Sequence, residues 1–228
     1  MVDLFGGAIV ITIPSQWRDV SQVRQVPDNQ EVYQDCTEES GGVIVVEILQ
    51  YQDDAHDGAF FFHDLGEANG IITTNTNNEL QEQSIIHSNR VVNLLGYACE
   101  EGNKEQIFPE LTLPPCTTLQ SQVCACLVNG SQQVVKEKSR NCANNSGNDN
   151  NNDDDNAAAA AQWIDIEMCA LRLKDIETDI LITLSVPRKE NGGRANSSPV
   201  SGTTAEGRAD MFKQILASFN IRDYSLFG

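Results

Sequence analysis

The sequence lacks the features that mark several protein classes. It contains neither G-x-x-x-x-G-K-[ST] nor G-x-G-x-x-G, the glycine-rich runs that cradle nucleotide phosphates. No apolar run approaches the roughly 20 residues needed to cross a bilayer. The N-terminus has no basic segment followed by an apolar core, so no secretory leader is expected. We therefore expect no bound nucleotide, no other cofactor and no membrane span.

Basic residues are few. Lys and Arg total 15 against 33 Asp and Glu, which gives a formal net charge of −18. Such a chain repels nucleic-acid phosphates and anionic membrane surfaces. We therefore expect neither nucleic acid nor a membrane as a partner, and we expect a basic protein instead. The acidic balance is equally typical of a protein that is simply very soluble.

Cysteine pairs with metal-binding spacing are also lacking. The seven cysteines are odd in number and irregularly spaced, and none forms a C-x-x-C pair. We interpret them as reduced thiols, which is typical of the cytosol or nucleus. Cys124 and Cys126 would share one side of a predicted strand, but a soft metal would need two further ligands. The pattern favours small buried hydrophobic side chains over a metal site.

The three histidines carry no catalytic motif. A helix predicted over residues 53–69 would place His56 and His63 on one face, about 10 Å apart along its axis. That separation is too large for one metal ion without more ligands. There is no G-x-S-x-G run, so a hydrolase using a cysteine or histidine remains only an alternative. We expect no catalytic residue and no metal.

Hydrophobic patterns predict one α+β domain over residues 1–228, an antiparallel β-sheet flanked by helices. The last four predicted strands form a meander, and its first hairpin turns at Asn129-Gly130 because Asn-Gly strongly favours such turns. Asp53 or Asp54 would cap the first helix. The predicted strands cover residues 7–13, 31–36, 43–49, 85–86, 91–95, 122–128, 131–138, 163–173 and 178–186, and the predicted helices cover 53–69 and 208–219.

Two polar segments interrupt this pattern. Residues 141–161 are rich in Asn and Asp and end in polyalanine, and residues 188–207 are rich in Gly, Ser, Asn and Thr. Neither can bury enough apolar surface to offset the entropy cost of ordering. We predict that both are disordered insertions within the domain.

A polar connector after the first predicted strand carries side chains that packing does not require. Charged and amide groups gathered on a connector at the rim of a sheet suggest a contact surface. Glu47 lies within a β-branched run and must point outward or be paired. Pointing outward, it would join Asp28 and Glu31 in one acidic patch that attracts a partner rich in Lys and Arg. The connector supplies Asp19, Arg24, Asp28, Asn29, Gln30 and Glu31.

Several runs resemble the Ran guanine nucleotide release factor (Mog-one) family. They are LFGGAI at 4–9, DVS at 19–21, RQVPDNQEV at 24–32, IVVEIL at 44–49, ALRL at 170–173, TDILIT at 178–183 and SLFG at 225–228. The resemblance implies a fold shared with the PsbP photosystem subunits. It also implies a monomeric, non-enzymatic regulator in the nucleus and cytoplasm that binds the GTPase Ran, promotes nucleotide release and supports nuclear import.

The resemblance also adds a site residue. The acidic surface of the family includes a strand segment that matches residues 46–50. Glu47 holds its first acidic position, and Gln50 stands where many members carry a second acid. Two other roles stay open: a trafficking adaptor that binds another basic protein through the same surface, and a PsbP-like photosynthetic subunit. The absence of a Ser/Arg-rich transit peptide argues against the second.

Overall fold

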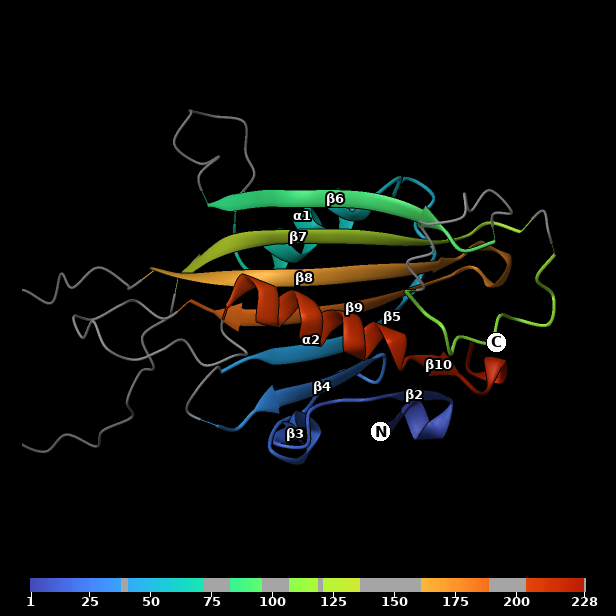
Figure 1. Cartoon of the computed structure of the whole chain (residues 1–228), viewed down its shortest axis with the longest axis horizontal. Helices are drawn as coiled ribbons and strands as arrows, with labels where there is room; N and C mark the ends of the chain where they lie inside the picture. The colour runs from blue at the N-terminus through green and yellow to red at the C-terminus, as the bar shows by residue number, and fades with distance from the viewer. Residues whose placement is uncertain are drawn as a thin grey trace, which may run out of the picture.

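The computed structural model describes residues 1–37, 41–71, 83–95, 107–118, 121–135, 161–188 and 204–227. These residues form two antiparallel sheets and two α-helices (Figure 1). The helices are α1 (Gly58–Ala68) and α2 (Ala205–Ala217). The strands are β1 (Val2–Leu4), β2 (Ile9–Ile11), β3 (Trp17–Asp19), β4 (Gln30–Asp35), β5 (Val43–Gln50), β6 (Ser84–Asn93), β7 (Val123–Val135), β8 (Ala161–Leu173), β9 (Thr178–Pro187) and β10 (Asn220–Ile221).

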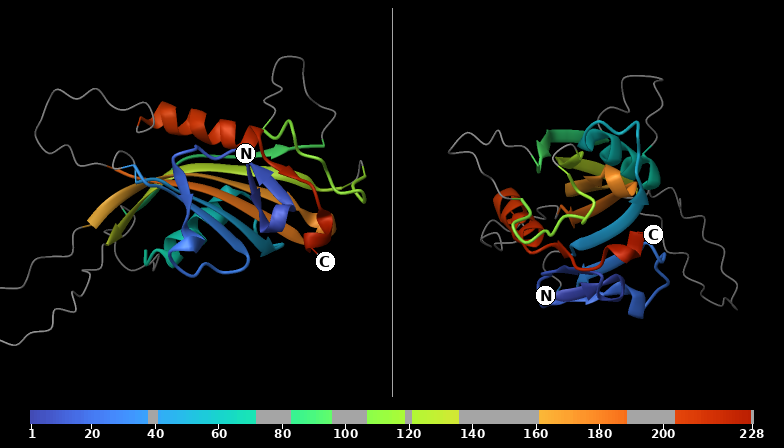
Figure 2. Two further views of the ribbon diagram at one scale, coloured as in Figure 1. Left: turned by 90° about the horizontal axis from the view of Figure 1, so that it is seen from below. Right: turned by 90° about the vertical axis from the view of Figure 1, so that its right-hand side faces the viewer.

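The large sheet has the order β3-β4-β5-β9-β8-β7-β6, and every neighbouring pair is antiparallel. A small sheet has the order β1-β2-β10, so segments near the two ends of the chain pair with each other. The views in Figure 2 show α1 and α2 on opposite faces of the large sheet. We call these the α1 face and the α2 face. The predicted α+β fold with flanking helices is confirmed.

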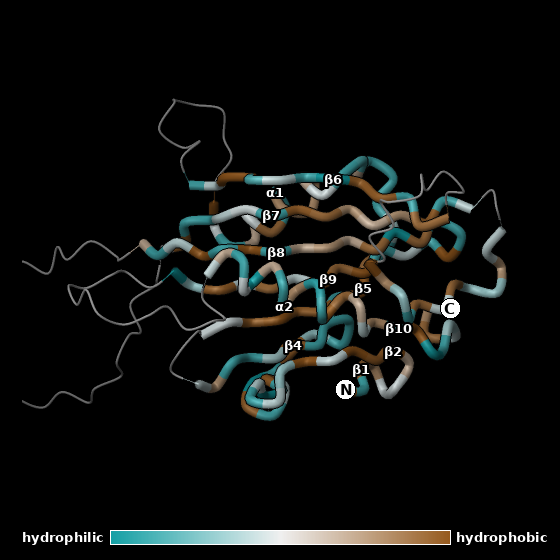
Figure 3. The backbone as a smooth tube through the Cα atoms, viewed as in Figure 1, coloured by the Kyte–Doolittle hydropathy of each residue, from teal (hydrophilic) through white to brown (hydrophobic). Residues whose placement is uncertain are grey.

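The larger hydrophobic core lies on the α2 face. Thr204 caps α2, since its Oγ1 accepts a hydrogen bond from the Gly207 N–H at 3.0 Å. Phe212 and Leu216 of α2 pack with the small sheet and with one side of the central strands. Figure 3 shows that β7, β8 and β9 are largely hydrophobic, whereas the edge strand β6 carries more hydrophilic residues. The central strands are buried on both faces, and this explains their nearly continuous apolar sequence.

The smaller core lies on the α1 face. Helix α1 packs on β6, β7 and β8 and buries Phe61 and Phe62 against them. The helix begins later than predicted because Asp57, not Asp53 or Asp54, accepts the capping bond from the Ala59 N–H. His56 therefore precedes the helix and does not share a helical face with His63.

The predicted hairpin at Asn129-Gly130 is wrong, because β7 runs straight through both residues. Gly130 has no side chain where Phe62 crosses the sheet. A Cβ placed there would lie 2.4 Å from Phe62 Cζ and 2.5 Å from the Ile85 carbonyl oxygen. Glycine is thus required here for close packing and not for a turn.

The two short strands predicted at 85–86 and 91–95 form the single strand β6. Its pairing with β7 shifts register between Ile86 and Ser88, which leaves His87 at a bulge. The bulge breaks the alternation of side chains, and this break explains why the sequence pattern indicates two fragments. The meander is therefore β6-β7-β8-β9.

The two predicted insertions fall largely outside the described residues. Of residues 141–161, the structure describes Ala161, which begins β8. Of residues 188–207, it describes Arg188 and 204–207, and Ala205 begins α2 because Thr204 caps the helix. The last residues of each predicted insertion therefore belong to regular elements.

Candidate functional site

The turn between β1 and β2 explains the two consecutive glycines in the LFGGAI run at residues 4–9. Phe5, Gly6 and Gly7 have φ angles of 49°, 68° and 95°, a left-handed conformation that glycine adopts without strain. The Phe5 N–H donates a hydrogen bond of 2.8 Å to Glu31 Oε1. Glu31 thus stabilises the one residue of this turn whose side chain resists positive φ.

The register of β4 and β5 separates the predicted acidic residues. Gln30 pairs with Glu47, and Glu31 pairs with Val46. Successive side chains of a strand point to opposite faces, and paired residues share a face. Val46 lies in the core of the α2 face, so Glu31 points to the α2 face and Glu47 to the α1 face. The predicted single patch that includes Glu31 and Glu47 is therefore wrong.

Three of the predicted site residues do meet on the α1 face. Glu47 Oε1 accepts hydrogen bonds from Gln30 Nε2 at 2.8 Å and from Asn29 Nδ2 at 3.4 Å. Asn29 Nδ2 also donates to the Ile48 carbonyl at 3.1 Å, and the Ile48 N–H donates to the Asn29 carbonyl at 2.9 Å. These bonds fix the Glu47 carboxylate at one oxygen. Within the described ranges, Oε2 receives no hydrogen bond.

The Glu47 surface is the half-buried carboxylate with its two amide partners, Asn29 and Gln30. Helix α1 packs on β6, β7 and β8, so it does not cover this part of the sheet. The neighbouring side chains on the same face are apolar: Val45 is half-buried, and Leu181 of β9 pairs with Glu47. A carboxylate that is oriented and bordered by apolar groups is suited to accept an N–H group from a cationic partner.

Two other predicted site residues gather on the opposite face. Asp19 pairs with Tyr33, which lies on the same side of β4 as Glu31. Burial raises the pKa of Tyr33, and the negative charges of Glu31 and Asp19 raise it further. Asp19 Oδ1 also accepts a hydrogen bond from the Ser21 N–H at 2.8 Å, which caps a short 3₁₀ turn. The carboxylates of Asp19 and Glu31 are therefore each bound to a backbone N–H of a turn, that of Ser21 and that of Phe5.

The remaining predicted residues are exposed and separate. Arg24 follows the 3₁₀ turn, and its backbone N–H bonds to the Val20 carbonyl at 3.1 Å. Asp28 lies in the turn before β4. Gln50 is the last residue of β5, and the alternation of side chains directs it to the face opposite Glu47.

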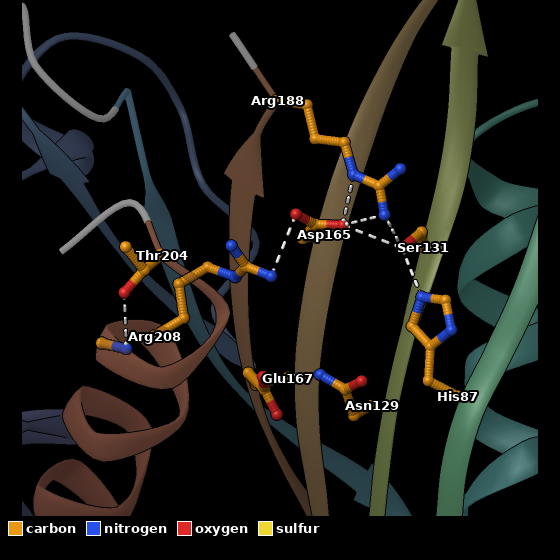
Figure 4. A network of polar contacts seen from close by, with 9 residues as sticks. His87, Asn129, Ser131, Asp165, Glu167, Arg188, Thr204 and Arg208 are labelled. Carbon is orange, nitrogen blue, oxygen red and sulfur yellow. Dashed lines mark hydrogen bonds and ion pairs between the residues drawn. The ribbon is translucent and has the colours of Figure 1, made fainter. Parts of the chain in front are cut away.

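A second polar cluster, which the sequence analysis missed, lies on the α2 face (Figure 4). Asp165 of β8 is at its centre. Its carboxylate accepts hydrogen bonds from Ser131 Oγ at 2.8 Å and Arg188 Nε at 2.7 Å, and it forms an ion pair with Arg208 Nη2 at 3.0 Å. Although burial raises the pKa of Asp165, the bonds from Arg188 and Ser131 and the charge of Arg208 hold it below its ordinary value.

This cluster does not have the geometry of a hydrolytic triad. His87 Nε2 lies 2.9 Å from Ser131 Oγ, but Asp165 contacts the serine instead of the histidine. In a triad the histidine lies between the nucleophile and the carboxylate. Ser131 is also fully buried. The geometry therefore gives no support to the hydrolase alternative.

Cys124 and Cys126 share one side of β7, as predicted, and this side is the α1 face. Cys126 is buried and Cys124 is half-buried. A hydrogen bond from Cys126 lowers the pKa of Cys124 to about 7, against the effect of burial and with help from the charge of Arg172. Arg172 is itself held in a buried ion pair with Asp179 at 3.0 Å. The described residues contain no cluster of three or more His, Cys, Asp or Glu side chains that could hold a metal ion.

In the part of the chain that the structure describes, no helix has both the length and the apolar character needed to span a membrane.

The described site residues divide into the Glu47 surface on the α1 face and the Asp165 cluster on the α2 face. The first was predicted in part. The second was not, because Asp165 and Glu167 alternate with apolar residues in a way that predicts exposure.

Comparisons with known proteins relate these features to a family. The sequence model of a family described as "Ran-interacting Mog1 protein" matches residues 2–187. The chain is 27% identical over 235 residues to the Ran guanine nucleotide release factor of Danio rerio, covering 99% of this chain and 98% of that protein. It is 24% identical over 240 residues to the nuclear import protein MOG1 of Saccharomyces cerevisiae, covering 100% and 84%.

The fold is also similar to a solved structure. The crystal structure of the Ran-binding protein Mog1p of Saccharomyces cerevisiae superposes with a TM-score of 0.57 at 22% sequence identity. The alignment covers 100% of this chain and 97% of that one. At this identity the likeness concerns the fold alone.

Proposed function

Because the chain belongs to the Ran-interacting Mog1 family, we propose that it binds the GTPase Ran and promotes the release of guanine nucleotide from it. The observation that carries this proposal is the family match, which extends from β1 to the end of β9. The relative of Danio rerio named Ran guanine nucleotide release factor is matched over 98% of its own length. The chain acts as a non-enzymatic regulator, and it works in the nucleus and cytoplasm in support of nuclear import.

The Glu47 surface is the part of the molecule that we propose contacts Ran. Glu47 Oε1 is held by Gln30 and Asn29, and neither of these two residues donates to Oε2. A Lys or Arg of Ran would donate to Oε2, and the amides would fix the carboxylate before the partner arrives. Asp28, exposed in the adjoining turn, adds charge that attracts a basic partner.

The other residues of the predicted site take a supporting place in this proposal. Glu31 and Asp19 face the α2 side, where Glu31 holds the Phe5 turn and Asp19 caps the 3₁₀ turn. The 3₁₀ turn lies within the polar connector, and the hydrogen bond from the Phe5 N–H attaches Glu31 of the connector to the turn between β1 and β2. These two residues therefore act on the shape of the connector and make no contact with Ran, whereas Arg24 is an exposed residue of the connector and Gln50 is exposed at the end of β5.

Release of nucleotide follows if the binding of this protein to Ran and the binding of nucleotide to Ran are coupled. Ran-type GTPases hold the nucleotide phosphates through a lysine-bearing loop and Mg²⁺. A protein that binds nearby and prefers the loop conformation of weaker nucleotide affinity lowers the affinity of Ran for nucleotide by some factor. By linkage, it must bind nucleotide-free Ran more tightly than loaded Ran by that same factor. The Glu47 surface supplies this preference by holding basic or switch residues of Ran away from the nucleotide.

The test measures both sides of this linkage. Purified Ran carrying a fluorescent GTP analogue is mixed with the protein, and the rate of fluorescence change is recorded against protein concentration. We expect release to accelerate until it saturates, and we expect calorimetry to show tighter binding to nucleotide-free Ran. A release rate that stays unchanged at saturating protein would remove the proposal.

A further inference from the structure

Two thiols and a guanidinium share the α1 face where β7 pairs with β8. Cys124 and Cys126 are two residues apart on β7, so their side chains point to the same face. Arg172 of β8 pairs with Cys124 in the register of the sheet, and paired residues share a face. Cys169 of β8, in contrast, points to the α2 face and packs in the larger core.

The two thiols differ in exposure. Cys126 is fully buried beneath α1, in the smaller core that includes Phe61. Cys124 is half-buried, so small solutes can reach its sulfur. The Cys126 thiol donates a hydrogen bond to the Cys124 sulfur, and the buried thiol therefore contacts the accessible one. A reagent that approaches the pair from solvent meets Cys124 first.

The guanidinium of Arg172 is held at several points. Its Nε donates to Asp179 Oδ1 at 3.0 Å, and its other nitrogens donate to the carbonyls of Gln52 and Ala55. Its Cζ also lies 4.3 Å from the centroid of the Tyr51 ring, a cation–π contact. These contacts come from β9 and from the segment before α1. They keep the positive charge in place beside the thiols.

These neighbours divide the roles of the two thiols. The hydrogen bond from Cys126 and the charge of Arg172 lower the pKa of Cys124 to about 7, although burial and the charge of Asp179 act against them. The same hydrogen bond and burial raise the pKa of Cys126, so that this thiol keeps its proton. The thiolate is the nucleophilic form, and Cys124 is therefore the reactive member of the pair. An accessible thiolate beside a second cysteine is typical of redox-sensing thiols.

The spacing of the pair allows a disulfide at the limit of its geometry. Two residues along a strand separate their Cα atoms by about 6.4–6.8 Å, and disulfides span Cα separations of about 4.4–6.8 Å. A bridge near the upper limit is strained, and strained bridges are easily reduced. A disulfide formed here would therefore open again in the presence of a thiol reductant.

We propose that Cys124 and Cys126 form a peroxide-sensitive thiol pair that closes reversibly to a disulfide. The Cys124 thiolate attacks one oxygen of hydrogen peroxide, so that an S–O bond forms, the O–O bond breaks and hydroxide leaves. The Cys126 thiol then attacks the sulfur of this sulfenic acid, the S–O bond breaks, and the thiol proton leaves with the hydroxyl group as water. The two sulfurs together lose two electrons, which peroxide accepts. This chemistry does not depend on the proposed binding of Ran.

The first experiment measures the reactivity of each thiol. The reduced full chain is alkylated with iodoacetamide at a series of pH values, and mass spectrometry of its peptides gives the rate at each cysteine. We expect the rate at Cys124 to reach half its maximum near pH 7. In Cys126→Ala, which removes the donor, the rate at pH 7 should fall about tenfold relative to its plateau, because the pKa returns toward about 8.5. Cys126→Ser keeps a donor and should lie closer to the wild type.

The second experiment follows oxidation. Hydrogen peroxide should remove two hydrogen atoms from the wild-type peptide that contains the pair, and dithiothreitol should restore them. Cys126→Ala cannot close the bridge and should instead give a sulfenic acid at Cys124, which dimedone traps. The matched control is Cys116→Ser, which removes an exposed thiol from the segment before β7 and should leave the bridge unchanged.

Several results would overturn the proposal, and those on the wild type do not depend on the folding of any variant. They are a wild-type pair that stays reduced in millimolar peroxide, a bridge from Cys124 to Cys116, and a sulfenic acid that persists at Cys124 in the wild type. Thermal unfolding shows whether Cys126→Ala is folded. An alkylation midpoint at Cys124 that is the same in folded C126A and in the wild type would also overturn it.

Discussion

At the residue scale, Glu31 ties two segments of the chain together. Its carboxylate accepts the Phe5 N–H in a turn where Phe5 has positive φ. Glu31→Ala removes the acceptor and should lower the free energy of unfolding by about 1–2 kcal/mol. Glu31→Gln keeps an acceptor oxygen and should cost well under half as much. Urea denaturation measures both, and equal losses for the two variants would show that the bond to Phe5 is not the reason.

Gly130 is a second residue with a specific packing role. An alanine Cβ there would lie 2.4 Å from Phe62 Cζ, within a buried strand paired on both sides. Gly130→Ala should therefore lower the free energy of unfolding by about 1–3 kcal/mol, the usual cost of overpacking. Gln34→Ala, at an exposed position of β4, is the control and should change it by less than about 0.5 kcal/mol. A G130A variant as stable as the wild type would contradict the packing argument.

At the element scale, β8 carries two carboxylates on the α2 face, Asp165 and Glu167, whose folded-state pKa values are shifted in opposite directions. The folded-state pKa of Asp165 is lowered, so its contribution to stability is present above its unfolded pKa of about 4 and is lost as the pH falls through the folded value. The folded-state pKa of Glu167 is raised, so its contribution is present at acid pH and is lost as the pH rises through the folded value.

This difference predicts that substitutions of the two carboxylates change the pH dependence of the free energy of unfolding in opposite directions. The loss of stability on acidification below about pH 4 should be shallower in Asp165→Asn than in the wild type, because that variant no longer loses a paired carboxylate. Glu167→Gln should instead make the loss steeper at higher pH, between the unfolded pKa of Glu167 of about 4.3 and its raised folded-state pKa, since the proton that Glu167 takes up on folding in that range is gone. Urea midpoints measured across the acid range test both slopes. Slopes that move in the same direction for the two variants would contradict the assignment.

The elements show which features sequence patterns can predict. Both helices and the strands β2, β4, β5, β8 and β9 follow from apolar periodicity and from caps, with shifts of a few residues at their ends, whereas the short strands β1, β3 and β10 were not predicted. The errors at β6 and β7 have a common physical origin. Asn129-Gly130 favours a turn locally, but pairing with β6 and β8 and the approach of Phe62 to Gly130 override that preference. The bulge at His87 hides the continuity of β6 in the same way.

At the scale of the whole molecule, the net charge of −18 should govern encounter with a basic partner. Electrostatic steering acts on the association rate and is screened by salt. We expect the association rate constant with Ran to fall by about tenfold or more between low and high ionic strength, with a smaller change in the dissociation rate. Stopped-flow fluorescence measures both. An association rate that does not depend on salt would show that the acidic charge plays no part in encounter.

The candidate site shows the limit of sequence reasoning at this scale. The polar connector and Glu47 could be identified because their residue types are not those of a core. Which residues share a face depends on the pairing of β4 with β5, and this pairing separates Glu31 from Glu47. The Asp165 cluster could not be predicted, because Arg188 and Arg208 approach Asp165 from segments distant in the sequence.

The account depends most on the claim that the Glu47 carboxylate contacts Ran from the α1 face while Glu31 serves the connector from the other face. The most direct measurement compares Ran binding by Glu47→Gln and Glu31→Gln, each of which removes one charge and keeps an acceptor oxygen. We predict that E47Q weakens binding by about tenfold, the value of a lost charged hydrogen bond, and that E31Q binds within about twofold of the wild type. Equal affinities for wild type and E47Q in folded samples, or a larger loss for E31Q than for E47Q, would contradict the claim.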